Sequence, residues 1–196
     1  MNANFLDIGL SYAIDTPIFT LGPKGTSSEF ASVHFCNWMK KYYSNSDHEI
    51  NLKQTYEEAR DNLTGQNGLL IVANAYSRIN DFYMDPRLSL LATFVLDTPP
   101  YGLAVANNHL LKEKFNIASH PAPIPLIEEL LPQHLEVEQV IQMPSTSAAA
   151  KAVASGDVDM ALTTEIAARI NKLTFISKCR PIHMLWSVFG TVKNYN

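Results

Sequence analysis

Short apolar runs alternate with helix-like segments along most of the chain, and this alternation is the feature that most limits the fold. The run Ile18–Leu21 ends at Gly22 and Pro23, and a segment with helical spacing of apolar residues follows it. Further strand candidates at 69–72, 137–141 and 157–162 each adjoin a helix-like segment. Because strands that alternate with helices are typical of α/β proteins, we expect an α/β fold.

Hydroxyl side chains stand at three expected strand-to-helix junctions, at 26–28, 145–147 and 163–164. Thr26 and Glu29 have the spacing of a capping box. Unpaired N–H groups and the helix dipole make such a junction a good anion site, although ordinary N-capping explains a single one equally well. The first two junctions are expected on opposite lobes of the protein, the bounds of which follow below. Two helix N-termini that face each other across a cleft would favour a site for a small dianion, such as a dicarboxylate.

Residues 97–100, Asp-Thr-Pro-Pro, form the best hinge in the sequence. We therefore expect two lobes, lobe 1 at about 17–98 plus 174–196 and lobe 2 at about 99–173. Residues 1–196 are expected to form one domain made of these two lobes.

Composition excludes several classes of protein. Of the 196 residues 46% are hydrophobic and 17% charged, which excludes a disordered chain. A formal charge of -4 supplies no broad cationic face, so we expect no nucleic-acid partner. Cys36 and Cys179 are far apart and lack metal-ligand spacing, so we expect two buried free thiols and no metal. No apolar run can span a membrane and no signal peptide is evident, which favours a soluble, cytoplasmic protein.

Several motifs together resemble the prephenate dehydratase family. Residues 20–29, TLGPKGTSSE, are similar to its opening motif, and Ser119-His120-Pro121 resembles its SHP segment. Ser145-Thr146 followed by alanines looks like its STxxA helix start. The resemblance runs from about Thr20 to Gly190 with the motifs in order.

Three departures from the dehydratase pattern concern the expected site. Ala75-Tyr76-Ser77 replaces a Glu-Asn-Ser triplet, Leu126 replaces a glutamine, and Met184-Leu185-Trp186 replaces the catalytic Thr-Arg-Phe. With these replacements the chain more closely resembles the prephenate decarboxylases of bacilysin-type, aeruginosin-type and salinosporamide-type pathways. Residues 97–105, DTPPYGLAV, are similar to the same branch.

The resemblance implies that 1–196 is a single prephenate dehydratase-like catalytic domain without a regulatory ACT domain. It implies a two-lobed, periplasmic-binding-protein-like fold with the active site between the lobes. It also implies that prephenate loses carbon dioxide without aromatisation. The ring hydroxyl is kept and an allylic ring carbon is protonated. The product would be used for natural-product or antibiotic biosynthesis. No cofactor is expected, and the dehydratase relatives suggest a homodimer. The substrate-binding residues carried over or placed in the altered segments are Thr26, Ser27, Tyr76, Ser77, Ser119, Ser145, Thr146, Ser147, Met184 and Trp186.

The acid that protonates the ring is not identified by the resemblance. Tyrosine and histidine are suitable by chemical type, which leaves five side chains, although each could equally be a packing residue. We favour Tyr101 and His120 as catalytic residues, because the first follows the hinge and the second lies in a family motif. The other three are Tyr76, Tyr83 and His183.

Two alternative functions share parts of this evidence. Prephenate dehydratase activity would use the same substrate and form phenylpyruvate. A non-catalytic binding module for small anions would also suit two α/β lobes around a cleft. Likewise, residues 184–186 could simply be a buried strand, which is compatible with their lining a pocket.

Overall fold

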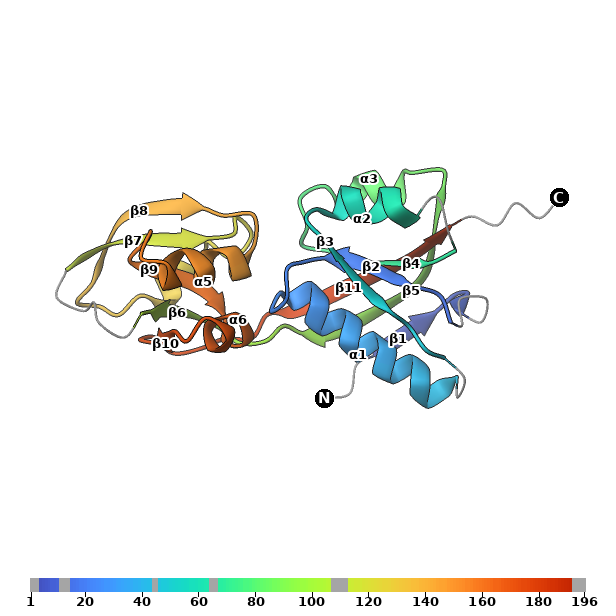
Figure 1. The fold of residues 1–196 in the computed structure, drawn as a ribbon, viewed down its shortest axis with the longest axis horizontal. Helices are drawn as coiled ribbons and strands as arrows, with labels where there is room; N and C mark the ends of the chain where they lie inside the picture. Colours follow the sequence, from blue (N-terminus) through green and yellow to red (C-terminus); the bar gives the residue numbers. More distant parts are fainter. Residues whose placement is uncertain (1–3, 11–14, 44–45, 64–66, 107–112, 192–196) are drawn as a thin grey trace. The chain divides into compact units, whose positions relative to one another are not determined.

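The computed structural model describes residues 4–10, 15–43, 46–63, 67–106 and 113–191. The chain divides into two compact units, each built around its own sheet (Figure 1). Unit 1 comprises residues 1–22, 28–97 and 183–196, and unit 2 comprises residues 23–27 and 98–182. The short segment 23–27 thus belongs to unit 2, although it lies between a strand and a helix of unit 1.

Unit 1 contains a six-stranded mixed sheet in the order β1-β5-β11-β4-β2-β3. Strands β2, β3 and β4 run parallel, while β11 pairs antiparallel with both β4 and β5. The last strand of the sequence therefore occupies the interior of the sheet. The bounds are β1 (Asn4–Asp7), β2 (Ile18–Leu21), β3 (Ile50–Lys53), β4 (Leu69–Ala73), β5 (Leu88–Asp97) and β11 (His183–Thr191).

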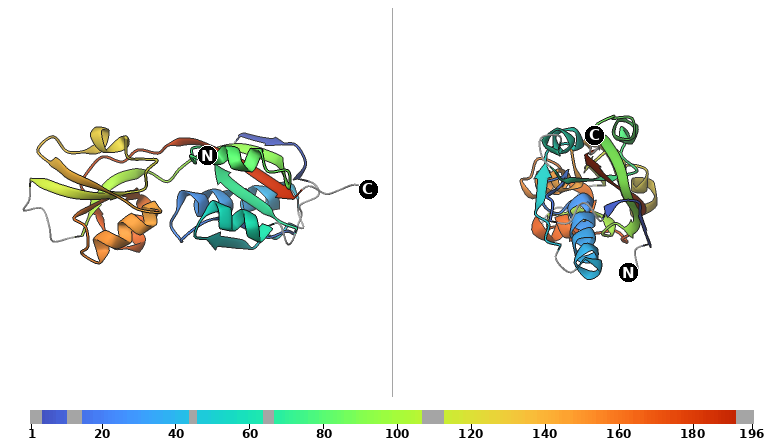
Figure 2. Two further views of the ribbon diagram at one scale, coloured as in Figure 1. Left: turned by 90° about the horizontal axis from the view of Figure 1, so that it is seen from above. Right: turned by 90° about the vertical axis from the view of Figure 1, so that its right-hand side faces the viewer.

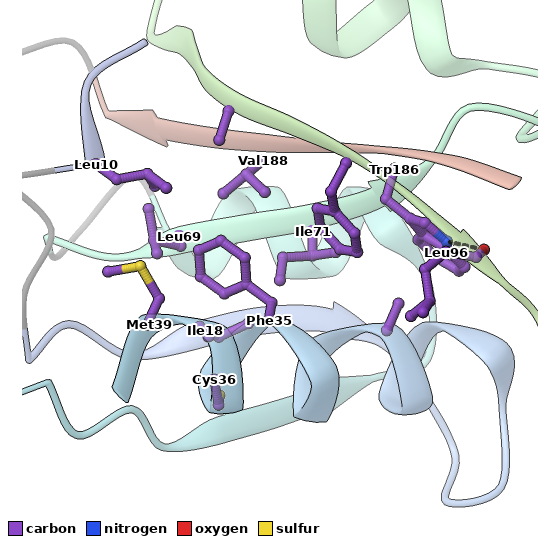
Figure 3. Packing of buried hydrophobic residues seen from close by; sticks show 13 residues of the cluster. Leu10, Ile18, Phe35, Cys36, Met39, Leu69, Ile71, Leu96, Trp186 and Val188 are labelled. Atoms are coloured by element: carbon purple, nitrogen blue, oxygen red, sulfur yellow. Dashed lines mark hydrogen bonds between the residues drawn. The ribbon is translucent and has the colours of Figure 1, made fainter. Parts of the chain in front are cut away.

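Helix α1 (Ser27–Tyr42) covers one face of this sheet, while α2 (Tyr56–Leu63) and α3 (Ile79–Tyr83) cover the other (Figure 1). Under α1 the aromatic rings of Phe35 and Phe94 lie 5.9 Å apart and pack with aliphatic side chains from the strands (Figure 3). The helical spacing of apolar residues after Pro23 predicts a core-facing stripe of Ala31, Phe35, Trp38, Met39 and Tyr42. Ala31, Phe35 and Met39 are buried, whereas the prediction is wrong at Tyr42, which is 59% exposed at the end of the helix.

Unit 2 contains a five-stranded sheet in the order β10-β6-β9-β7-β8. Strands β7, β8 and β9 run parallel, and β6 pairs antiparallel with β9 and β10. Helix α4 covers one face, and α5 and α6 cover the other (Figure 2). The bounds are β6 (Tyr101–Val105), β7 (Lys114–Ser119), α4 (Leu126–Leu130), β8 (Glu136–Gln142), α5 (Thr146–Ala154), β9 (Met160–Thr164), α6 (Glu165–Ile170) and β10 (Thr174–Phe175).

Two expectations from the sequence need correction. The predicted lobe boundary at 174 differs from the structure, which places residues 174–182 in unit 2 because β10 pairs with β6. The prediction of two buried thiols holds for Cys36, whose pKa is raised by burial to about 11, but Cys179 is exposed. Cys179 lies in the irregular segment between β10 and β11.

Candidate functional site

The predicted binding residues of unit 2 gather where its parallel strands end. Strand β7 ends at Ser119, directly before His120, β8 leads through Ser145 into α5, and β9 ends at Thr164 before α6. Because β7, β8 and β9 are parallel, their carboxyl ends lie at one edge of the sheet. Ligands of α/β proteins bind at this edge, so the topology supports the predicted location in unit 2.

Hydroxyl side chains cap both helices that begin at this edge. Ser145 Oγ accepts a hydrogen bond from the N–H of Ala148 at 3.0 Å, and Thr164 Oγ1 accepts one from the N–H of Ala167 at 3.2 Å. Each capping residue has an extended backbone, as an N-cap requires. The sequence prediction that Thr163 or Thr164 caps this helix is confirmed for Thr164, and the helix start predicted at Ser145-Thr146 is also confirmed.

Three side chains of unit 2 contact the segment 23–27. Ser147 Oγ donates to the carbonyl of Lys24 at 3.0 Å, and Thr164 Oγ1 donates to the carbonyl of Gly25 at 3.1 Å. The hydroxyls of Ser27 and Tyr101 lie 3.0 Å apart. Sequence reasoning missed this anchoring role. Since Ser147 has one hydroxyl proton, it can donate to a substrate carboxylate only by releasing Lys24.

Tyr101 and His120, the predicted catalytic residues, both lie in unit 2. Tyr101 is buried on β6, and desolvation raises its pKa, which the hydrogen bond from Ser27 partly offsets. His120 Nδ1 accepts a hydrogen bond from the N–H of Ala122 at 3.2 Å, and burial lowers the pKa of the imidazole. Neutral His120 therefore carries its proton on Nε2 and is a hydrogen-bond donor there. Ser119 Oγ donates to the carbonyl of His120 at 2.8 Å, which fixes this turn.

Unit 1 places its altered triplet at the carboxyl end of β4. Tyr76 donates to Glu57 Oε1 at 2.8 Å, and burial together with this carboxylate raises the pKa of Tyr76 to about 12. Its ring lies 4.9 Å from that of Tyr56. Ser77 follows as an exposed side chain. Tyr76 therefore supplies an aromatic surface with a strongly held proton.

Three side chains at the same end of β4 form a closed set, of which only Tyr83 was a candidate from the sequence. Tyr83 Oη lies 2.7 Å from Ser187 Oγ, and Ser187 Oγ donates to Asn74 Oδ1 at 2.7 Å. Asn74 Nδ2 completes the set by donating to Tyr83 Oη at 3.4 Å. The three residues come from α3, β11 and the turn after β4, so only the tertiary structure brings them together.

The residues at the Thr-Arg-Phe positions face in different directions along β11. Trp186 is 1% exposed in the core beneath α1, where its Nε1 donates to the carbonyl of Leu96 at 3.3 Å (Figure 3). Strand alternation points this side chain into the core, and the predicted contact of Trp186 with substrate stays a prediction. Met184 packs half-buried against the same core, whereas Leu185 is 41% exposed.

Among the described residues, no group of three or more His, Cys, Asp and Glu side chains could hold a metal ion. Within the same part of the chain, no helix has the length and apolar character needed to cross a membrane.

Solved structures define the fold class. The prephenate dehydratase of Arthrobacter aurescens in complex with L-Phe matches with a TM-score of 0.63 and 11% identity, over 91% of this chain and 61% of that chain. The prephenate dehydratase of Staphylococcus aureus matches with a TM-score of 0.60 and 15% identity, over 92% of this chain and 69% of that chain. The periplasmic VFT2 domain of Bordetella pertussis BvgS matches with a TM-score of 0.55 and 16% identity, over 93% of this chain and 83% of that chain. The predicted periplasmic-binding-protein-like, prephenate dehydratase type of fold is thus confirmed.

Curated relatives give the family. No family model matches the chain. The prephenate decarboxylase of Planktothrix agardhii is 41% identical over 181 residues, which are 88% of this chain and 88% of that protein. That of Bacillus subtilis strain 168 is 41% identical over 178 residues, 87% of this chain and 84% of its own. The chain therefore belongs to the prephenate decarboxylase family, which the sequence motifs predicted.

Proposed function

We propose that this chain decarboxylates prephenate without aromatising its ring. The observation that carries the proposal is the 41% identity to prephenate decarboxylases over 87–88% of the chain. The product would be a dihydro-4-hydroxyphenylpyruvate that keeps the ring hydroxyl and supplies natural-product or antibiotic biosynthesis.

The outcome of the reaction depends on which group receives a proton. When carbon dioxide leaves, the electron pair of the broken bond enters the ring. An acid at the ring hydroxyl would then release water and aromatise the ring, whereas an acid at the neighbouring ring carbon gives the dihydro product. Met184 and Leu185 carry no acidic proton, and Trp186 donates its only N–H to Leu96. This part of β11 therefore offers no donor to the hydroxyl.

A variant that restores the missing polar groups tests this explanation. Met184→Thr with Leu185→Arg should form some phenylpyruvate, and Trp186 is kept because its side chain belongs to the core. The Met184→Thr single variant is the control, since it lacks the cation. A folded double variant that binds prephenate and forms no phenylpyruvate would count against the explanation.

Tyr101 and His120 are proposed to bind the oxygen atoms of prephenate. Burial makes Tyr101 harder to ionise and keeps His120 neutral, so both suit hydrogen bonding better than proton transfer near neutral pH. Losing a hydrogen bond to a charged group costs about 1.5–3 kcal/mol, so Tyr101→Phe and His120→Ala should each raise KM by roughly 10-fold to 100-fold. Unchanged KM values in both variants would remove them from the site.

Turnover of prephenate tests the proposed function itself. The purified chain should release carbon dioxide from prephenate while the near-UV absorbance of an aromatic product stays absent. Phenylpyruvate formation would indicate dehydratase activity, and binding without turnover would indicate a passive binding module. Light scattering on the same preparation tests the expected homodimer.

A further inference from the structure

The five side chains that could protonate the ring differ in their surroundings. The hydroxyl of Tyr76 is held by a carboxylate, and that of Tyr101 is buried beside Ser27. His120 is kept neutral by burial. His183 Nδ1 lies 2.5 Å from Asp97 Oδ1 with its side chain 81% exposed, so water surrounds this pair. Each of the four is therefore poorly placed to deliver a proton to a bound ring.

Tyr83 differs from these four in the groups around its hydroxyl. Ser187 Oγ lies at 2.7 Å and Asn74 Nδ2 at 3.4 Å, and neither group carries a charge. While Tyr83 is protonated, Ser187 donates to Asn74 and can accept the tyrosine proton. If Tyr83 gave its proton away, Ser187 could turn its own O–H toward the phenolate, and Asn74 would already donate to it. The conjugate base of Tyr83 is thus provided with two neutral donors.

The position of these three residues also fits a binding edge. Asn74 directly follows β4, whose carboxyl end lies beside that of the parallel strand β2. Ser187 is fully buried and Asn74 is half-buried, while Tyr83 is 38% exposed and is the member most open to a ligand. The Tyr83 ring is held edge-on against Phe189 at 5.1 Å. Leu185 is two residues from Ser187 on the same face of β11, which adds an exposed apolar side chain to this edge.

We propose that Tyr83 is the acid that protonates the ring carbon next to the hydroxyl-bearing carbon, with Ser187 and Asn74 as positioning residues. This assignment rests on the proposed function. The bond between the ring and the carboxylate breaks, carbon dioxide leaves, and the electron pair shifts through the adjacent double bond to the ring carbon. That carbon takes the Tyr83 proton, so one C–H bond forms as one C–C bond breaks. Water then returns a proton to the phenolate, and no oxidant or reductant is needed.

Deuterium labelling with a Tyr83→Phe variant tests the assignment. In deuterated water the normal chain should place deuterium on one face of the new CH2 group. Tyr83→Phe should lower kcat by roughly 10²–10⁴-fold, the usual loss for a general acid, with KM nearly unchanged, and its residual product should carry deuterium on both faces. A purely structural role would change stability or KM but would leave the label on one face.

A matched control and a second variant complete the experiment. Tyr43→Phe removes a tyrosine hydroxyl that donates to Asp7 Oδ2 at 2.8 Å, and it should leave both kcat and the label unchanged. Ser187→Ala keeps Tyr83 but removes one donor to its phenolate, so kcat should fall by about 10-fold to 100-fold. If Tyr83→Phe does not fold, Ser187→Ala decides.

The outcomes separate the two proposals. If the normal chain forms no dihydro product, the proposed function fails. If it forms that product and Tyr83→Phe keeps a normal kcat or one-face labelling, only the assignment of Tyr83 is overturned.

Discussion

Gly25 holds the segment 23–27 in a backbone conformation that other residues rarely adopt. Its φ is +87°, and an added Cβ would lie 3.1 Å from Ile170 Cδ1 and 3.2 Å from Ser147 Oγ. Gly156 has a similar φ of +82° with nothing within 4 Å of such a Cβ. A side chain added at Gly156 would therefore meet backbone strain alone, whereas one added at Gly25 would meet both strain and crowding.

Alanine substitutions at these glycines should differ in cost. Gly156→Ala should destabilise by about 1–2 kcal/mol, the cost of a left-handed conformation for an L-residue. Gly25→Ala should lose roughly 1–3 kcal/mol more, because overpacking is added to the same strain. Urea denaturation measures both free energies of unfolding, and equal losses would show that Ile170 and Ser147 move aside freely.

Asp85 makes the free energy of unfolding depend on acidity. Two side-chain hydrogen bonds from Arg87, at 2.8 and 2.6 Å, are the main cause that lowers the pKa of Asp85 from 3.8 to about 2. A lowered folded-state pKa stabilises the fold above the unfolded-state value, and this contribution disappears as the pH falls through about 4 to 2. Asp85→Asn should therefore reduce the loss of stability over this range, by about 1 kcal/mol after solvent screening.

Denaturation at a series of acidic pH values measures this effect. Asp47→Asn is the control, because it removes an exposed carboxylate and leaves the Asp85–Arg87 hydrogen bonds in place. Parallel pH curves for Asp85→Asn and the unmodified chain would contradict the assignment.

Residue-level prediction from sequence succeeded where a local rule applied. Ser145 and Thr164 stand directly before helices, and their capping bonds form within three residues. The set formed by Tyr83, Ser187 and Asn74 could not be predicted, because up to 113 residues separate its members. Hydrogen bonds of this kind depend on which strands are neighbours, and one sequence does not state that.

Among the elements, α5 begins at a single capping side chain. Ser145→Ala should destabilise by about 1 kcal/mol, because it leaves the N–H of Ala148 without its acceptor, while Ser145→Gly should cost only a few tenths. Thermal unfolding of the two variants provides the comparison. If alanine and glycine were equivalent, the cap would not contribute to stability.

Strand β11 shows the limit of prediction for elements. Its apolar residues indicated a closing strand, and β11 is indeed a strand. Its position between β4 and β5, with Trp186 facing α1 and Ser187 facing α3, follows from non-local pairing and strand alternation. The sequence left open whether Trp186 belongs to a buried strand or lines a pocket, and the pairing places its side chain in the core beneath α1.

At the scale of the whole molecule, the alternation of strands and helices was sufficient to predict the α/β class, and ordered motifs were sufficient for the family. From the sequence we also expected the chain to return to the first lobe at residue 174, whereas unit 2 extends to Ile182. The pairing of β10 with β6 covers only Thr174 and Phe175, and backbone hydrogen bonds at Ile176, Arg180 and Ile182 continue the contact with the segment 98–103. A pairing this short leaves almost no pattern in the sequence.

The central claim is that prephenate loses carbon dioxide and keeps its ring hydroxyl. The mass of the product formed by the purified chain tests this most directly. We predict a single keto acid that is lighter than prephenate by carbon dioxide alone. A product lighter by carbon dioxide and water together would be phenylpyruvate, and it would contradict the account.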